Sequence, residues 1–316
     1  MRWRIKTKTI LVTPRSVTQN GHVSLSRLER AGYTVVLSPA GRFPTEGELT
    51  QLLPDCVGFL AGVEPVTAKV LESARSLRVI SRNGSGLDNI DLDAARKLNI
   101  EVCSAEGANA RGVAELTMAL ILSVTRTIPY SDARLKQGGW KRKQGIELRG
   151  RTLGLIGCGS IGREVACLAL GFGMRVLAYD PVRTDFLGPS LPFHYGSLDD
   201  VLSQSDIVSL HCPPLPGGEA LVCAHTIGRM KRGVYIINTA RGTLLQEDDV
   251  LEAIKGGHVA GLAVDVFRTE PPDEIELLRH ENVIATPHIG GFTNESVDRA
   301  MESAVDNLLA NLDNGK

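Results

Sequence analysis

The chain has 316 residues, 43% hydrophobic and 22% charged, which is long enough for two domains with ordinary hydrophobic cores. Its 35 Lys and Arg residues balance 36 Asp and Glu residues, so bulk charge gives no reason to expect a nucleic-acid or membrane partner. No apolar run reaches the roughly 20 residues that span a bilayer. We therefore expect a cytoplasmic protein without nucleic-acid or membrane partners.

The six cysteines contain no CxxC pair, which is typical of isolated thiols in a reducing compartment. Cys212, Cys223 and His225 could be read as three metal ligands. Zinc sites usually bring their ligands in close pairs, however, so we interpret these residues as unrelated and expect no metal.

Short apolar runs alternate with helix-like stretches between residues 9 and 103. The stretch HVSLSRLERAG is amphipathic and ends at Gly32. Strand–helix alternation of this kind predicts a parallel sheet covered by helices. The expected strands are TILVTP, TVVLSP, VGFLAG, LRVIS and IEVCS.

Residues 113–128 form an almost wholly apolar helical pattern, and a second amphipathic helix follows, closed by Gly138 and Gly139. Strand–helix alternation then resumes at residue 152, and a last helix covers roughly 293–312. This pattern predicts two α/β units, residues 1–103 plus 288–316 and residues 104–287, with the last helix returning to the first unit. The expected strands of the second unit are TLGLIG, RVLAYD, DIVSLH, VYIINT, VAGLAVDV and NVIATP.

The stretch LGLIGCGSIG places three glycines in a GxGxxG pattern between a predicted strand and a predicted helix. Such a turn lets the backbone approach a pyrophosphate at a helix N-terminus, and an acid about 20 residues further on accepts hydrogen bonds from a ribose. Asp180 has that spacing and would repel a 2′-phosphate, which favours NAD over NADP, although Arg183 weakens the preference. The expected cofactor residues are Gly157, Gly159, Ser160, Ile161, Gly162 and Asp180.

Three polar residues follow other predicted strands, namely Arg241, Glu270 and His288. Ligands of open parallel sheets collect at the carboxyl ends of the strands. Arginine can bind a carboxylate through two parallel hydrogen bonds, glutamate can hold one imidazole nitrogen, and histidine can move a proton near neutral pH. The three predict a catalytic set, but each alone could be a surface residue, and spacing does not show that they meet.

Seven stretches resemble motifs of one protein family. They occur along this chain in the same order as in that family. They are RNGSGLDNID (82–91), NARGVAEL (109–116), GLIGCGSIG (154–162), LHCP (210–213), NTARG (238–242), DVFRTEPP (265–272) and TPHIGG (286–291). The chain resembles the D-isomer-specific 2-hydroxyacid dehydrogenases, most closely their phosphoglycerate-dehydrogenase-like branch, in a short form without a regulatory domain.

The resemblance implies a Rossmann NAD-binding domain at 104–287 and a discontinuous flavodoxin-like substrate domain at 1–103 plus 288–316. It implies a homodimer built on the helices near 113–140. It also implies hydride transfer between NAD and a small D-2-hydroxy or 2-oxo acid, phosphorylated or sugar-derived. Arg241 would bind the carboxylate and polarise the C2 oxygen, His288 would be the acid/base, and Glu270 its partner. Further cofactor residues implied are His211, Cys212, Pro213, Thr239, Ala240 and Asp265, and the substrate residues are Asn83, Gly84, Ser85 and Gly86.

The chain departs from the phosphoglycerate pattern in the loop FLAGVEPVT, which lacks the expected phosphate-binding arginine. Glu64 in that loop would repel a phosphate, which leaves Arg15, Arg82 or Arg111 as substitutes. Asn83 and Ser85 replace an expected Tyr and Val. The substrate pocket is therefore expected to be more polar than is usual in the family, which suits a sugar-derived or doubly anionic acid.

Two alternatives stay open. The same residues could oxidise formate or a phosphorus oxyanion. The fold is also shared by NAD-sensing scaffolds related to transcriptional co-repressors, which would show ligand-linked oligomerisation with negligible turnover. The sequence shows no added tail or peptide-docking extension for the second alternative.

Overall fold

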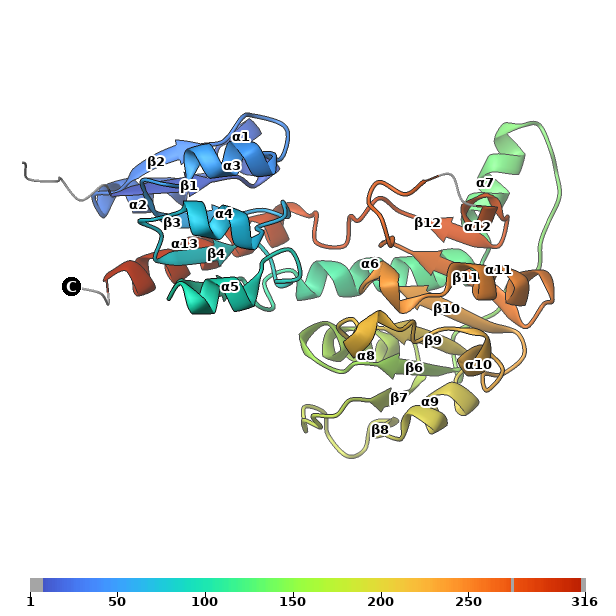
Figure 1. Cartoon of the computed structure of the whole chain (residues 1–316). Coiled ribbons are helices and arrows are strands. Elements are labelled where there is room, and N and C mark those ends of the chain that lie inside the picture. The colour runs from blue at the N-terminus through green and yellow to red at the C-terminus, as the bar shows by residue number, and fades with distance from the viewer. Residues whose placement is uncertain (1–7, 274–275, 314–316) are drawn as a thin grey trace, which may run out of the picture. The chain divides into compact units, whose positions relative to one another are not determined.

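The computed structural model describes residues 8–273 and 276–313, so most of the basic opening MRWRIKTK lies outside the described residues. The chain divides into two compact units, residues 1–109 with 294–316 and residues 110–293 (Figure 1). The sequence places these crossings earlier, at 103/104 and 287/288. Residues 104–109 belong with the first unit, because Ser104 lies in a strand of its sheet and Ala105 donates its N–H to Gly84 O at 3.0 Å. The turn at 289–290 belongs with the second because it is bonded to Asp265.

The first unit is a five-stranded parallel sheet with helices on both faces. Its strands are β1 (Thr9–Val12), β2 (Thr34–Leu37), β3 (Cys56–Ala61), β4 (Val79–Arg82) and β5 (Glu101–Ser104), and its helices are α1 (Arg15–Asn20), α2 (Leu25–Arg30), α3 (Glu46–Leu52), α4 (Ala68–Ser73), α5 (Leu92–Lys97) and α13 (Asn294–Asp313). The strand order is β2-β1-β3-β4-β5, all parallel. This is the flavodoxin-like order, so the expected fold of the substrate unit is confirmed.

Alternation along the strands gives the first unit two cores. Leu11 and Phe59 face the helices α3 to α5, whereas Ile10 and Leu60 face α13. The strands therefore read as continuous apolar runs, since both of their faces are buried. Gly58 lets α13 approach β3, because a Cβ there would lie 3.2 Å from Leu312 Cδ1.

The second unit is a seven-stranded parallel sheet. Its strands are β6 (Thr152–Ile156), β7 (Arg175–Tyr179), β8 (Phe193–Tyr195), β9 (Ile207–Leu210), β10 (Val234–Asn238), β11 (Val259–Val264) and β12 (Val283–Ala285). The helices are α6 (Ala110–Thr125), α7 (Ile128–Lys136), α8 (Ser160–Gly171), α9 (Leu198–Gln204), α10 (Ala224–Ile227), α11 (Glu247–Lys255) and α12 (Glu276–Arg279), with 3₁₀ turns η1 (Pro216–Gly218) and η2 (Gly242–Leu244). The order β12-β11-β10-β9-β6-β7-β8 reverses direction between β9 and β6, as in a Rossmann fold.

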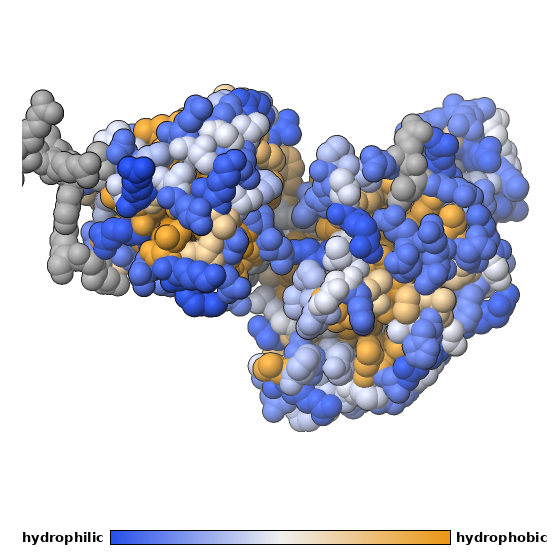
Figure 2. Space-filling model, in the orientation of Figure 1, coloured by the Kyte–Doolittle hydropathy of each residue, from blue (hydrophilic) through white to orange (hydrophobic). Residues whose placement is uncertain are grey.

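Helices cover both faces of this sheet as well. Residues of α6 and α8 pack together on one face, including Ile121 and Val165, and α9 to α11 cover the other. The long apolar helix ends at Thr125 rather than at residue 128, because Thr127 takes a φ of 51° and starts a new helix before Pro129. On the face shown in Figure 2, hydrophilic residues predominate in each unit. None of the helices among the described residues is long and apolar enough to cross a membrane.

Candidate active site

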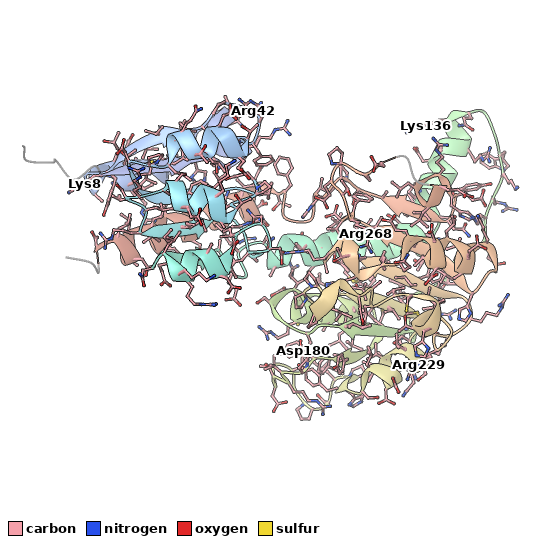
Figure 3. All side chains as sticks on the ribbon, viewed as in Figure 1. Lys8, Arg42, Lys136, Asp180, Arg229 and Arg268 are labelled. Carbon is pink, nitrogen blue, oxygen red and sulfur yellow. The ribbon has the colours of Figure 1, made fainter. Side chains whose placement is uncertain are left out.

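The residues expected at the second unit's site all follow strands at one edge of its sheet. In sheet order, His288 follows β12, Asp265 and Glu270 follow β11, and Arg241 follows β10. His211 follows β9, the glycine turn follows β6, and Asp180, labelled in Figure 3, follows β7. Since every strand is parallel, all seven carboxyl ends meet at this edge. The catalytic candidates therefore lie on one side of the β9/β6 reversal and the ribose acid on the other.

The glycine turn has the shape that a pyrophosphate requires. Gly157 has a φ of 96° and a Cβ there would lie 2.5 Å from the His211 backbone, while a Cβ at Gly162 would lie 2.4 Å from Gly157 O. At Gly159, by contrast, a Cβ would meet nothing within 4 Å, so space is left open beside the turn. Gly159 is the N-cap residue before α8 and has no side chain to cap it, which leaves the first N–H groups of that helix available to an anion. These residues fit a dinucleotide.

Asp180 is attached to the same turn. Its Oδ2 accepts a hydrogen bond from the Cys158 N–H at 2.6 Å, and its Oδ1 accepts one from the Val182 N–H at 2.8 Å. Carboxylate oxygens have further lone pairs, so both can still accept bonds from ribose hydroxyls. Arg183, which could favour a 2′-phosphate, lies over the ring of Tyr195 at 5.9 Å.

Asn238 shapes the loop that carries Arg241. This fully buried amide accepts the Ala240 N–H at 3.0 Å and donates to Arg241 O at 2.8 Å. Arg241 in turn donates from Nη1 to Ala240 O at 2.7 Å. A buried amide that bonds both ends of a loop fixes the direction in which the loop's side chain leaves it. Asn238 was not singled out from the sequence as a positioning residue.

The Arg241 loop lies against the segment that carries Glu270. A Cβ at Gly242 would lie 2.0 Å from the Phe267 backbone, so only glycine allows this approach. The Phe267 N–H donates to Glu270 Oε1 at 3.1 Å, and the other oxygen, Oε2, lies 2.7 Å from His288 Nδ1. Glu270 and His288 therefore meet, which spacing alone could not establish.

Asp265 holds the turn that carries His288. Its Oδ1 accepts bonds from the Thr286 hydroxyl at 2.6 Å and the Ile289 N–H at 2.8 Å, and its Oδ2 accepts the Gly290 N–H at 2.8 Å. His288 itself has a φ of 52°, a conformation that non-glycine residues rarely adopt. Such strain often marks functional positions. The contacts of the buried Asp265 side chain are those of a positioning residue, whereas the resemblance implies a cofactor contact.

The loop after β9 supplies neutral groups to the same edge. Burial lowers the pKa of His211 to about 3, so its ring is uncharged near neutral pH. Its Nε2 lies 2.9 Å from the Ser209 hydroxyl, and its buried Nδ1 has no hydrogen-bond partner among the described residues. Burial raises the pKa of the Cys212 thiol to about 11, which keeps it protonated. In the neighbouring loop after β10, the Thr239 hydroxyl forms a hydrogen bond with the Thr117 hydroxyl at 3.0 Å.

In the first unit, residues 83–86 form a turn at the carboxyl end of β4. Gly84 has a φ of 143° and lies against the Arg82 guanidinium, which donates to Asn83 O at 2.9 Å. The Ser85 hydroxyl donates to Asn109 Oδ1 at 3.1 Å. The turn is thus fixed from both sides.

Of the three arginines suggested as phosphate ligands, Arg15 and Arg111 differ in their surroundings. Arg15 begins α1 and is exposed at the carboxyl end of β1, in the same unit as the 83–86 turn. Arg111, in the second unit, is bound by Glu115 at 2.6 Å and by Glu164 at 3.2 Å. Those two carboxylates favour a surface ion-pair role for Arg111. Among the described residues, no three His, Cys, Asp or Glu side chains are grouped as a metal site.

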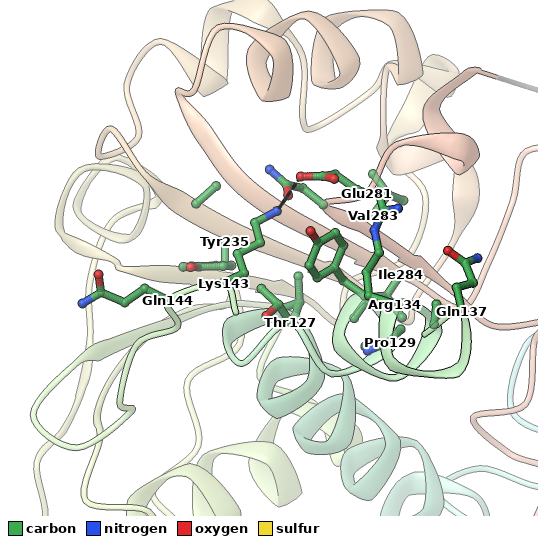
Figure 4. Close-up of a pocket in the computed structure, with 15 residues that line it drawn as sticks. Thr127, Pro129, Arg134, Gln137, Lys143, Gln144, Tyr235, Glu281, Val283 and Ile284 are labelled. Carbon is green, nitrogen blue, oxygen red and sulfur yellow. Dashed lines mark hydrogen bonds and ion pairs between the residues drawn. The ribbon is translucent and has the colours of Figure 1, made fainter. Parts of the chain in front are cut away.

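At the opposite edge of the second unit's sheet, α7 borders a pocket of about 400 Å³ (Figure 4). The Tyr130 ring lies there between Arg134 and Lys143, at 5.4 and 5.2 Å from its centroid. Lys143 binds Glu281 at 2.9 Å. The pocket is remote along the strands from the glycine turn, so it is separate from the candidate active site.

A reversing parallel sheet, a glycine turn with room for a pyrophosphate, and an adjacent Arg, Glu and His are the features of a dinucleotide-dependent oxidoreductase. The comparisons with known proteins agree. A family model described as "D-isomer specific 2-hydroxyacid dehydrogenase, NAD binding domain" matches residues 118–290. The chain therefore belongs to the D-isomer-specific 2-hydroxyacid dehydrogenase family, and NAD is its cofactor.

Individual relatives are similar over most of this chain. A hydroxypyruvate reductase of Thermotoga maritima is 42% identical, over 84% of this chain and 88% of that protein. Human D-3-phosphoglycerate dehydrogenase is 40% identical over 81% of this chain, which spans only 48% of that longer protein. Among solved structures, the TT0316 protein from Thermus thermophilus has a TM-score of 0.87 at 35% identity, covering 97% of both chains. A D-lactate dehydrogenase from Aquifex aeolicus, complexed with NAD and lactic acid, has a TM-score of 0.82 at 30% identity, covering 97% of this chain and 95% of that one.

Proposed function

We propose that this protein transfers a hydride between NAD and a small D-2-hydroxy acid or the corresponding 2-oxo acid, phosphorylated or sugar-derived. The observation that carries the proposal is the contact of 2.7 Å between His288 Nδ1 and Glu270 Oε2, at the sheet edge that also carries Arg241 and the glycine turn. Glu270 occupies one imidazole nitrogen. The other, Nε2, is then the atom that exchanges a proton with the C2 oxygen of the substrate.

Bound NAD supplies the hydride acceptor or donor. In the oxidative direction, neutral His288 takes the proton from the C2 hydroxyl. In the reductive direction it begins protonated, and the Glu270 carboxylate stabilises the imidazolium. Acid/base catalysis of this kind is typically worth about 10²–10⁴-fold. Arg241 binds the carboxylate of the acid and polarises the C2 oxygen, and fixing the substrate in this way lowers the barrier by several kcal/mol.

Further residues would bind the two ligands. The backbone of residues 83–86 would bind the substrate carboxylate through its N–H groups. Gly159, Ser160 and Ile161 would bind the pyrophosphate at the start of α8, and Asp180 the adenosine ribose. The remaining residues proposed to line the cofactor site are Gly157, Gly162, His211, Cys212, Pro213, Thr239, Ala240 and Asp265.

The test is a panel of candidate substrates, and turnover of each is measured from the change in nicotinamide absorbance. Glyoxylate, pyruvate, hydroxypyruvate and hydroxypyruvate 3-phosphate are offered with NADH, and formate and phosphite with NAD. We expect turnover of at least one 2-oxo acid and none of formate or phosphite. Oxidation of formate or phosphite alone would replace the proposed substrate class. NADH binding that changes the oligomeric state without turnover of any compound would favour the sensing scaffold.

We also propose a homodimer that forms through α6 and α7. Helix α7 buries none of its own residues, and Leu135 and Trp140 are 59% and 85% exposed. A segment that exposes apolar side chains of this kind is more stable when a second copy covers them. A cytoplasmic location is proposed on the six free cysteines, which fit a reducing compartment.

A further inference from the structure

The loop after β3 in the first unit contains a buried carboxylate without a cation. Glu64 is 2% exposed, whereas glutamate is almost never fully buried unless it is paired. Within the part of the chain that the structure describes, no lysine, arginine or histidine forms an ion pair with it. The Glu64 side chain therefore places a carboxyl group in the interior with no cationic partner among the described residues.

The carboxylate is fixed by the loop itself. Oε1 accepts hydrogen bonds from the Thr13 hydroxyl and from the Gly62 N–H, the latter at 2.9 Å. The amide of Asn89 holds the same loop by donating to Glu64 O at 2.7 Å. A Cβ at Gly62 would lie 2.6 Å from Glu64 Oε2, so the backbone passes directly beside this oxygen. An N–H group that could have bound a ligand anion is thus already taken by the protein's own anion.

The position of Glu64 is that of a ligand site. Strands β1, β3 and β4 are neighbours in a parallel sheet, and Thr13, Glu64 and Asn83 follow their carboxyl ends. Asn83 is joined to the β3 end because its N–H donates to Ala61 O at 2.8 Å. The loop carrying Glu64 is therefore adjacent to the 83–86 turn, which is proposed to bind the substrate carboxylate.

Two oxygens of these adjacent loops lack donors. Glu64 Oε2 and Asn83 Oδ1 are both buried without a hydrogen-bond partner among the described residues. A buried acceptor without a donor lowers the stability of the protein. These two oxygens therefore favour a ligand that donates hydrogen bonds. A phosphate dianion has little to donate, and a like charge within about 4–6 Å is disfavoured.

We propose that Glu64 is a specificity-determining residue. It selects 2-oxo acids whose end remote from the carboxylate carries a hydroxyl, and it rejects those carrying a phosphate there. The inference rests on the proposed function, because it needs residues 83–86 to bind the substrate. It narrows that function to an unphosphorylated acid with a donor group.

Hydroxypyruvate and hydroxypyruvate 3-phosphate differ only in the phosphate and so form the test pair. The reductive kcat/KM of each is measured for the wild type and for Glu64→Gln. Glutamine keeps an oxygen that can accept the Thr13 and Gly62 bonds but removes the charge, so the variant should fold, which circular dichroism and the Tm would verify. Glu72→Gln, at an exposed position on α4, is the control with the same change in net charge.

We expect the wild type to prefer hydroxypyruvate by at least ~100-fold, and Glu64→Gln to reduce this ratio at least ~10-fold by accelerating the phosphorylated substrate. The control should leave the ratio within ~2-fold. An unchanged ratio in a folded, active Glu64→Gln enzyme overturns the inference, as does a wild type that prefers the phosphate.

If the wild type reduces neither compound, neither hydroxypyruvate nor its 3-phosphate is a substrate, and the kinetic comparison cannot be made. The inference is then decided by calorimetric binding of D-glycerate and D-3-phosphoglycerate to the enzyme–NADH complex. Tighter binding of D-glycerate, with the difference diminished in Glu64→Gln, supports it. Equal binding, absence of binding or a preference for D-3-phosphoglycerate contradicts it.

Discussion

His288 Nδ1 lies 2.7 Å from Glu270 Oε2, although 18 positions separate the two residues in sequence. The pair is held from both ends, by the Phe267 N–H on one Glu270 oxygen and by the bonds of Asp265 to the turn around His288. The imidazole therefore has a fixed direction before any substrate arrives, which is what an efficient acid/base requires.

Replacing His288 by glutamine should lower kcat/KM by at least ~100-fold in both directions, because the proton of the C2 oxygen then has no acceptor or donor. NADH affinity, measured by fluorescence titration, should change less than ~2-fold. His225→Gln, at an exposed position on α10, should leave both quantities unchanged. Near-normal turnover in His288→Gln would refute the assignment.

Glu270→Gln should shift the pH profile of reduction to lower pH. Reduction needs protonated His288, so the rate falls as pH rises through the loss of that proton, and removing the neighbouring negative charge makes this loss easier. The profile of kcat/KM against pH is measured for both enzymes with the best 2-oxo acid. A profile that does not move would count against the pairing, whatever the drop in rate.

Arg241→Ala should lower kcat/KM for the 2-oxo acid by at least ~100-fold while leaving NADH affinity nearly unchanged. Arg241→Lys should recover only part of the loss, since an ammonium cannot form two parallel bonds to a carboxylate. Arg229→Ala, which removes a surface partner of Asp199, is the matched control. Full activity in the lysine variant would show that charge alone suffices at this position.

Asp180→Ala should raise the use of NADPH relative to NADH by at least ~10-fold. The carboxylate no longer repels a 2′-phosphate, and the ribose hydroxyls lose an acceptor. Steady-state kinetics with both cofactors at a fixed concentration of the 2-oxo acid give the ratio. Asp185→Ala, exposed in the loop after β7, should leave that ratio as it is.

Trp140→Ala should shift the protein toward the monomer in light scattering at low micromolar concentration, because the indole is 85% exposed on the segment that α7 begins. Trp3 lies outside the described residues, so Val182→Ala, at a 72% exposed apolar position of the second unit, serves as the control. A wild type that is monomeric at all concentrations would remove the dimer proposal.

The sequence was sufficient for the fold class because parallel strands buried on both faces read as unbroken apolar runs. β8 was missed, since Phe193–Tyr195 is three residues long and places His194 in its middle. The unit boundaries were misplaced because hydrogen bonds distant in sequence decide them, such as that from the Ala105 N–H to Gly84 O. The pattern of hydrophobic residues does not predict such bonds.

For the candidate site, the sequence predicted which residues follow the strands at one edge of the sheet. Asn238 and Asp265 show what sequence reasoning could not supply, because their roles depend on which backbone groups their side chains reach. A polar residue at the end of an apolar strand is the signal that could have pointed to Asn238, whereas Asp265 was named for a different role. The roles of Arg241, Glu270 and His288 stay predictions that the variants above test.

The first unit is built from both ends of the chain, and this sets the order in which the molecule can be completed during synthesis. Ile10, Leu60 and Val79 form a sheet face whose cover includes Met301, Val305 and Leu308 of α13. Until α13 leaves the ribosome, that apolar face stays partly open, while the continuous second unit has all of its strands. We therefore expect the nascent chain to fold its cofactor unit first and to need protection from aggregation at the β1–β3–β4 face until its last helix arrives.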